Sequence, residues 1–185
     1  MVKHAPGAPK RWVVTGGRGA GKTTFCRRAA ALAHAAGLDA AGILSPARME
    51  AGEKTGIYVA DVRTGAQRLL AAARAGEVRG FPLGRWHFDP DAIRWADEVL
   101  VRATPCDILI IDEIGPLELE LRRGLTAWES ALKSGAYRAA LVVVRCELAE
   151  EFGISKDVSA SLTITSPQQA LQAAEAFVRR FVDAV

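Results

Sequence analysis

The sequence GGRGAGKT occupies residues 16–23, directly after the apolar stretch WVVT at residues 12–15. Residues 23–36 then continue without Gly or Pro and are rich in Ala, and Gly37 follows as an expected helix C-cap. These three stretches predict a strand, a glycine-rich loop and a helix in immediate succession. That context matters, because the pattern G-x-x-x-x-G-K-[ST] indicates phosphate binding when a strand leads into it and a helix follows.

Each residue type in this loop has a physical reason to lie near phosphate groups. Glycines let successive backbone N–H groups turn inward, and the helix that follows contributes the positive end of its dipole. We expect Lys22 to reach the β- and γ-phosphate oxygens, Thr23 to bind Mg²⁺ and Thr24 to lie near the α-phosphate. The nucleotide-binding residues predicted in the loop are Gly16, Gly17, Arg18, Gly19, Ala20, Gly21, Lys22, Thr23 and Thr24.

A second pattern follows the most hydrophobic stretch of the chain. Residues 107–112 read DILIID, and an apolar run of this kind predicts a strand buried on both faces of a parallel sheet. Asp112 would end that strand at the edge where α/β sheets bind ligands, so it is the best candidate for the second Mg²⁺ ligand beside Thr23. Glu113 is a candidate general base for a water that attacks the γ-phosphate, and we expect Glu113 and Lys22 to be the catalytic residues.

Outside these motifs, apolar runs alternate with helical patterns. Strands are predicted at residues 40–44 and 139–144, and helices at residues 125–132, after the cap Asp89, and after residues 166–169, which form a capping box. Residues 56–62 and 67–72 could form a hairpin, although residues 69–74 could equally be helical. The alternation indicates an α/β domain with a mostly parallel sheet.

Length and composition favour one globular domain. The chain has 185 residues, of which 50% are hydrophobic and 24% charged. We expect residues 1–10 to be a flexible lead-in and residues 11–185 to form a single domain. The net charge of +3 is spread along the chain, so nothing indicates nucleic-acid binding. Three widely spaced cysteines and the lack of a long apolar stretch favour a cytoplasmic protein without disulfides, zinc or membrane attachment.

The two motifs together resemble a known family. GGRGAGKTT at residues 16–24, followed by IDEIGPLE at residues 111–118, is similar to the small nucleoside-triphosphatase family of archaea and bacteria, which includes the human cancer-related nucleoside-triphosphatase. Arg48, with Gly56 and Ile57, and the stretch LGRWHFD at residues 83–89 extend the similarity. It then covers about residues 12–132.

The resemblance implies a fold, an activity and further site residues. The fold would be a three-layer P-loop NTPase fold of the RecA-like branch, with a β-hairpin insertion. The activity would be Mg²⁺-dependent release of phosphate from ATP, GTP and other nucleoside triphosphates. Ile114, Gly115 and Pro116 would lie against the nucleotide. Two alternatives stay open: a nucleotide, nucleoside or polynucleotide kinase, with an acceptor lid within residues 48–85, and an accessory ATPase activated by a partner.

An arginine beside the γ-phosphate would speed its transfer by neutralising charge in the transition state. Arg48, Arg122, Arg123 and Arg145 are candidates because they follow predicted strands or the acidic segment, and a partner could also supply the group. The sequence does not choose among them. It also leaves open the base preference, the physiological substrate, the pathway, the oligomeric state and any protein partner.

Overall fold

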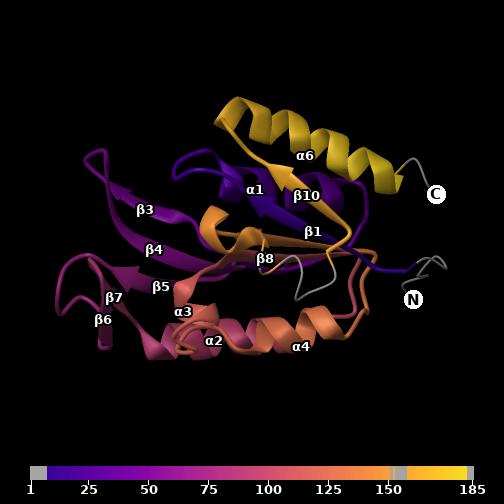
Figure 1. The fold of residues 1–185 in the computed structure, drawn as a ribbon. Coiled ribbons are helices and arrows are strands. Elements are labelled where there is room, and N and C mark those ends of the chain that lie inside the picture. The colour runs from indigo at the N-terminus through magenta and orange to yellow at the C-terminus, as the bar shows by residue number, and fades with distance from the viewer. Residues whose placement is uncertain (1–7, 151, 153–157, 183–185) are drawn as a thin grey trace.

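The computed structural model describes residues 8–150, 152 and 158–182. One sheet of ten strands runs between helices on its two faces (Figure 1). The strands are β1 (Lys10–Thr15), β2 (Ala40–Leu44), β3 (Ala47–Glu50), β4 (Glu53–Asp61), β5 (Gln67–Ala72), β6 (Phe81–Leu83), β7 (Trp86–Phe88), β8 (Ile108–Ile114), β9 (Ala139–Val144) and β10 (Ala160–Thr163). The helices are α1 (Lys22–Ala35), α2 (Pro90–Val101), α3 (Pro116–Leu119), α4 (Ala127–Lys133) and α6 (Pro167–Val182), with a short 3₁₀ turn, η1, at Cys146–Leu148.

Five strands form the parallel half of the sheet, in the order β10-β1-β9-β8-β2. Every residue of β2 and β9 is buried, because helices cover both faces of this half. The carboxyl ends of these strands meet at one edge, and β9 stands between β1 and β8. The predicted α/β fold with a mostly parallel core is confirmed.

The other half of the sheet is antiparallel and continues from β2 through β4, β5, β7 and β6, with β3 paired to β4. The predicted hairpin is β4 with β5, in which Tyr58 pairs with Leu69. The alternative helix at residues 69–74 is wrong, because Leu69 to Ala72 bond to β4 and Ala71 and Ala72 also pair with β7. The short strands β3, β6, β7 and β10 were not predicted, since each depends on a neighbouring strand for its hydrogen bonds.

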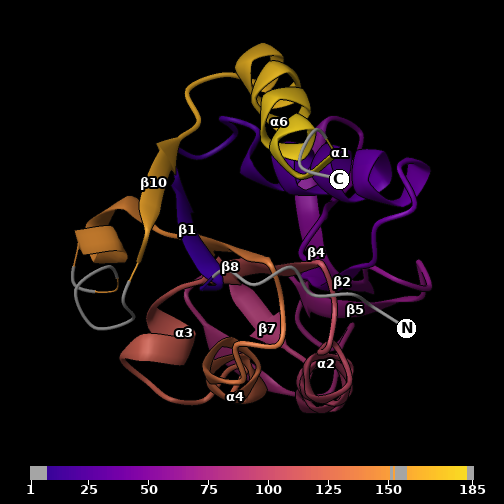
Figure 2. The same cartoon turned by 90° about the vertical axis from the view of Figure 1, so that its right-hand side faces the viewer.

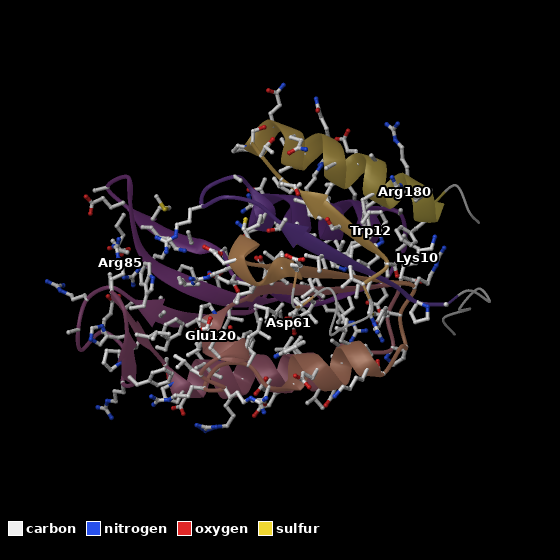
Figure 3. The ribbon with its side chains drawn as sticks, viewed as in Figure 1. Lys10, Trp12, Asp61, Arg85, Glu120 and Arg180 are labelled. Atoms are coloured by element: carbon white, nitrogen blue, oxygen red, sulfur yellow. The ribbon has the colours of Figure 1, made fainter. Side chains whose placement is uncertain are left out.

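Helices α1 and α6 pack on one face of the sheet, and α2 and α4 on the other (Figure 2). On the first face Phe25 of α1 and Phe177 of α6 meet edge to face, with ring centroids 6.1 Å apart. Arg180 of α6 lies over the ring of Trp12 in β1, with its guanidinium carbon 5.2 Å from the ring centroid (Figure 3). These contacts fix the C-terminal helix against the first strand and helix.

Most of the helix caps and helix ends predicted from the sequence are found in the structure. The Asp89 side chain accepts a hydrogen bond from the Asp91 N–H (2.8 Å) and caps α2. Ser166 Oγ accepts from the Gln169 N–H (3.2 Å), but the Gln169 side chain accepts from the Thr165 N–H (2.7 Å) instead of completing the capping box at Ser166. The predicted helix at residues 125–132 begins at Ala127. Most of the expected lead-in, residues 1–7, lies outside the described residues, and β1 begins at Lys10.

One partly buried carboxylate holds the connection between β8 and α4. Glu118 lies on α3, and its two oxygens accept hydrogen bonds from the backbone N–H groups of Gly115 (3.0 Å) and Leu125 (3.4 Å). Burial nevertheless raises the pKa of Glu118 to about 7, because desolvation disfavours the charged form more than these bonds favour it. This side chain therefore joins the start and the end of the loop that follows the acidic strand.

Replacing Glu118 with Gln is expected to change how stability depends on pH. The folded protein holds the Glu118 proton more tightly than the unfolded chain, in which the pKa is near 4.5. Between about pH 4.5 and pH 7 the free energy of unfolding should therefore fall as the pH rises, by an amount on the order of 3 kcal/mol from this group. Urea unfolding at about pH 5 and about pH 7.5 measures the fall, which should be smaller in Glu118→Gln.

Glu98→Gln serves as the matched control, because Glu98 lies exposed on α2 and should keep the wild-type pH dependence. Parallel stability curves for wild type and Glu118→Gln would contradict the assignment of this titration to Glu118.

Candidate active site

The glycine-rich loop joins β1 to α1 at the carboxyl edge of the parallel strands. Gly16 has a φ of +144°, and a Cβ there would lie 2.1 Å from the carbonyl oxygen of Ile164, so the backbones of the two segments approach too closely for any side chain. Gly17, Arg18 and Gly19 lie exposed at the surface. The backbone of the loop is therefore exposed to solvent at this edge of the sheet.

Helix α1 begins directly behind the loop and leaves its amino end uncapped. Its N-cap residue, Gly21, provides no side-chain hydrogen bond, and the first turn carries no acidic residue. The free N–H groups and the positive dipole end of α1 are therefore directed at the loop. The Lys22 ammonium donates hydrogen bonds to the carbonyl oxygens of Gly16 (2.7 Å) and Gly17 (3.0 Å). These bonds hold the positive charge of Lys22 next to the loop backbone.

Asp112 on β8 is buried and faces the start of α1. Its Oδ2 accepts a hydrogen bond from the Ser45 N–H (2.9 Å), and the Ser45 hydroxyl donates to the Asp112 carbonyl oxygen (2.8 Å). Thr23 is also close enough to the Asp112 carboxylate to lower its pKa. Burial raises the pKa of Asp112 to about 6, and the nearby Glu113 charge adds to the rise, while Ser45, Thr23 and Lys22 act in the opposite direction. The two predicted metal ligands, Thr23 and Asp112, therefore lie together.

A β-bulge orients the acidic pair. Ile111 pairs with Val142 and Ile114 with Val144, so Asp112 and Glu113 together stand opposite one residue of β9. Glu113 has a φ of +80°, in the left-handed region that costs a non-glycine residue about 1–3 kcal/mol. The extra residue reverses the alternation of side chains along β8, so that Ile111 and Ile114 both enter the core beneath α2 and α4.

The strand thus continues past Asp112 to Ile114, whereas the sequence predicted that it would end at Asp112. As a result Asp112 is 1% exposed, while the Glu113 side chain is 39% exposed beside it. One carboxylate is buried against Thr23 and the next reaches solvent. Strained residues at bulges are concentrated at functional sites, which agrees with this placement.

The residues that follow β9 contact both motifs. Arg145 Nη2 lies 3.7 Å from Glu113 Oε1, and the Arg145 N–H donates to the carbonyl oxygen of Ile114 (3.4 Å). The Thr15 hydroxyl donates to Cys146 Sγ (3.2 Å), and this bond, together with one from the Gly16 N–H, lowers the pKa of the Cys146 thiol. The short segment after β9 therefore touches the loop strand on one side and the acidic strand on the other.

The three residues that the resemblance placed against the nucleotide follow the bulge. The Ile114 side chain is fully buried in the core, so only its backbone can face a ligand. Gly115 is buried, and a Cβ there would lie 3.2 Å from Arg145 Nε. Pro116 is partly exposed at the start of α3. Of these three, Gly115 and Pro116 lie at the start of the connection between β8 and α4 that the hydrogen bonds of Glu118 hold together.

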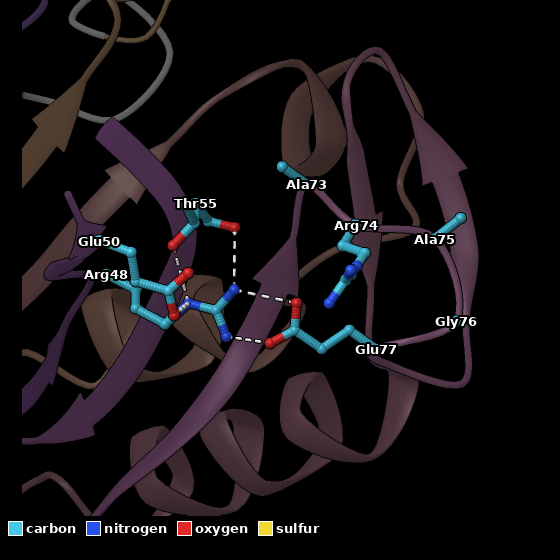
Figure 4. Close-up of a pocket in the computed structure, with 8 residues that line it drawn as sticks. All are labelled: Arg48, Glu50, Thr55, Ala73, Arg74, Ala75, Gly76 and Glu77. Atoms are coloured by element: carbon cyan, nitrogen blue, oxygen red, sulfur yellow. Dashed lines mark hydrogen bonds and ion pairs between the residues drawn. The ribbon is translucent and has the colours of Figure 1, made fainter. Parts of the chain in front are cut away.

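Arg48, one of the four arginine candidates, is held within the antiparallel half (Figure 4). Its Nε donates to Thr55 Oγ1 (3.0 Å), and its Nη2 to the Thr55 carbonyl oxygen (3.2 Å) and to Glu77 (2.9 Å), while Nη1 bonds the other Glu77 oxygen. This ion pair borders an open cavity of about 670 Å³ that Arg74 and Glu50 also line. The Arg48 guanidinium is therefore already hydrogen-bonded to residues of β4 and of the segment after β5.

The remaining candidates differ in what they touch. The Arg123 guanidinium lies over the Phe81 ring, 4.2 Å from its centroid, and Arg122 is exposed with a φ of +50°. Arg145 is the one of the four for which a contact with the acidic pair is found in the described structure. Ser45 was missed as a site residue, although its place directly after the strand at residues 40–44 was a usable signal.

The described residues contain no cluster of three His, Cys, Asp or Glu side chains that could hold a metal ion alone. A magnesium ion that is bound to phosphates needs fewer protein ligands. In such sites Mg²⁺ takes one or two protein oxygens and completes its coordination shell with phosphate oxygens and water. The hydroxyl of Thr23 and the carboxylate of Asp112 are such oxygens, so the donor set fits. Within the described ranges no helix is long and apolar enough to cross a membrane.

Comparisons with known proteins show the family to which the chain belongs. The model of the NTPase family matches residues 11–170. Nucleoside-triphosphatase THEP1 of Methanopyrus kandleri is 33% identical over 137 residues, which are 74% of this chain and 73% of that protein. The THEP1 protein of Ignicoccus hospitalis is 38% identical over 110 residues, 58% of this chain and 60% of its own length, so that match spans less than two thirds of the relative.

Two solved structures share the fold. The solution structure of a human cancer-related nucleoside triphosphatase gives a TM-score of 0.67 at 21% identity, over 93% of this chain and 97% of that one. THEP1 from Aquifex aeolicus gives 0.64 at 18% identity, over 91% and 97%. Since the family model covers most of the chain and the parallel core carries the expected loop and acidic pair, the chain belongs to the NTPase family of P-loop nucleoside-triphosphatases.

Proposed function

We propose that the protein hydrolyses nucleoside triphosphates, ATP and GTP among them, in a Mg²⁺-dependent reaction, and that residues 11–185 act as one domain. The observation that carries this proposal is the placement of Thr23 close to the buried Asp112, with the half-exposed Glu113 next to it. The names of the relatives support the same reaction. Free cysteines at Cys26, Cys106 and Cys146 support a cytoplasmic location.

The loop and the start of α1 would bind the phosphates. Backbone N–H groups of residues 16–24 and the dipole of α1 favour an anion at this place. Lys22, which is bonded to the loop carbonyls, needs only to exchange these acceptors for β- and γ-phosphate oxygens. Thr24, on the first turn of α1, would lie near the α-phosphate, and Gly115 and Pro116 would line the site from the acidic strand.

Thr23 and Asp112 would hold the magnesium ion. When bound, the ion neutralises charge on the β- and γ-phosphate oxygens and helps to orient them. The hydrogen bond from the Ser45 N–H fixes the orientation of the Asp112 carboxylate from the side of β2. The protein therefore supplies a hydroxyl and a carboxylate that already lie close together.

Glu113 would act on the attacking water. Its carboxylate reaches solvent one residue beyond Asp112, so it can accept the proton of a water on the γ-phosphate side. The water oxygen bonds to phosphorus, the bond to the β-phosphate oxygen breaks, and the electron pair leaves with the nucleoside diphosphate. The proton taken up by Glu113 then returns to solvent.

A kinase has one observation in its favour. The cavity bordered by Arg48 and Glu77 lies within residues 48–85, and its volume of about 670 Å³ is in the range of small-molecule sites. Glu113 favours hydrolysis instead, because transfer to a small acceptor does not require a carboxylate that activates water.

A panel of nucleoside triphosphates is expected to show phosphate release by the purified protein alone. Release should occur with several bases and should exceed transfer of labelled phosphate to nucleosides, nucleotides or polynucleotide ends. Phosphate release and radiolabel transfer are measured in the same reactions. Predominant transfer would support the kinase, and turnover that stays negligible until another protein is added would support the accessory ATPase.

Glu113→Gln is expected to lower kcat by about 10²–10⁴-fold, the usual contribution of a general base, because the amide cannot accept the water proton. Affinity for the nucleotide should stay within about threefold of wild type, since Glu113 is not expected to hold the phosphates. Steady-state phosphate release and the binding of a fluorescent nucleotide measure the two quantities.

Glu98→Gln, the same change on the exposed face of α2, should leave both values at the wild-type level. If Glu113→Gln binds nucleotide and hydrolyses it at the wild-type rate, Glu113 is not the base.

A further inference from the structure

The residue that follows β9 stands in the middle of the site. Strand β9 pairs with β1 through Val14 and Val143, and with β8 through Ile114 and Val144. Its carboxyl end therefore lies between the strand that leads into the phosphate loop and the strand that carries the acidic pair. Arg145 is the first residue beyond this end, and its N–H is bonded to the carbonyl oxygen of Ile114.

The Arg145 guanidinium lies against the acidic strand without being buried. Nη2 is 3.7 Å from Glu113 Oε1, Nε passes over the backbone of Gly115, and the side chain is 45% exposed. An ion pair this long and this exposed is weak, because water screens it. Phosphate oxygens accept two parallel hydrogen bonds from a guanidinium and are stronger partners. Arg145 is therefore held near the site by a contact that a phosphate can replace.

The other arginines considered are held elsewhere or lie apart from the acids. Arg48 makes four hydrogen bonds to Thr55 and Glu77, and Arg123 covers the Phe81 ring. Moving either would break contacts within the antiparallel half. Of the four candidates, Arg145 is the one for which a contact with the acidic pair is found in the described structure.

We infer that Arg145 contacts the γ-phosphoryl group in the transition state of hydrolysis and is paired with Glu113 before the nucleotide binds. The inference rests on the proposed function and names the arginine that the sequence left open. As the bond between phosphorus and the β-phosphate oxygen breaks, negative charge on the γ-phosphoryl oxygens is neutralised by Arg145. The same movement frees the Glu113 carboxylate to accept the proton of the attacking water.

Arg145→Gln is the first test, with kcat and binding measured separately. An arginine that contacts the transferring group contributes about 10³–10⁵-fold to kcat, so the variant should lose at least 100-fold. The dissociation constant for the nucleoside diphosphate should stay within about threefold of wild type. The affinity for the diphosphate with aluminium fluoride, which mimics the transition state, should fall much more.

Arg145→Ala with added guanidinium chloride at low millimolar concentration is the second test. Free guanidinium should restore part of the lost kcat, and ammonium chloride at the same ionic strength should not. Rescue of this kind depends on the chemical group and would not follow from a merely structural role. Arg123→Gln and Arg94→Gln are controls expected to retain the wild-type kcat, since one covers Phe81 and the other is exposed on α2.

Two results would overturn the inference while leaving the proposed function intact: a wild-type kcat in Arg145→Gln, or an equal loss of affinity for the diphosphate and for its aluminium fluoride complex. A large loss of kcat in Arg123→Gln with none in Arg145→Gln would assign the role to Arg123 instead. Failure of the proposed function is recognised separately, because the wild-type protein would then release no phosphate.

Discussion

The hydrogen bond from the Ser45 N–H to the Asp112 carboxylate, 2.9 Å long and buried, joins β2 to β8 at the carboxyl edge of the sheet. An ionised carboxylate at 1% exposure is unfavourable without partners, and the Ser45 N–H and Thr23 supply them. The Ser45 hydrogen bond and the nearness of Thr23 bring three elements, β2, β8 and α1, together at one point. The two proposed metal ligands lie at this point, the proposed base Glu113 follows Asp112 directly, and the loop ends here because Lys22 directly precedes Thr23.

The bulge at Asp112 and Glu113 turns one acidic dipeptide into two different groups. If β8 kept a regular alternation with no bulge, Glu113 would point to the same face as Ile111, and Ile114 would leave the core beneath α2 and α4. The positive φ of Glu113 carries a strain that the flanking pairs, Ile111 with Val142 and Ile114 with Val144, hold in place. A buried carboxylate suited to a metal and an exposed one suited to a water are thereby separated by a single peptide bond.

Much of the site was predictable because its signals are local. The spacing from Gly16 to Thr23 fixes a loop between a strand and a helix, and the apolar run before Asp112 fixes a buried strand. The bulge was not predictable, since it exists only through the register of β8 against β9. The place of Arg145 depends in the same way on β9 lying between β1 and β8. Strands β3, β6, β7 and β10 are too short to show in a pattern and form through their neighbours.

Phosphate release measured with Mg²⁺ and with excess EDTA, for wild type and for Asp112→Asn, shows whether Asp112 holds a Mg²⁺ ion that hydrolysis requires. The amide keeps the size of the side chain but lacks the negative charge that a divalent cation requires. We expect phosphate release by the wild type to depend on Mg²⁺, and the loss in Asp112→Asn to be comparable with that caused by EDTA. Release that continues in EDTA, or an Asp112→Asn variant as active as wild type, would contradict it.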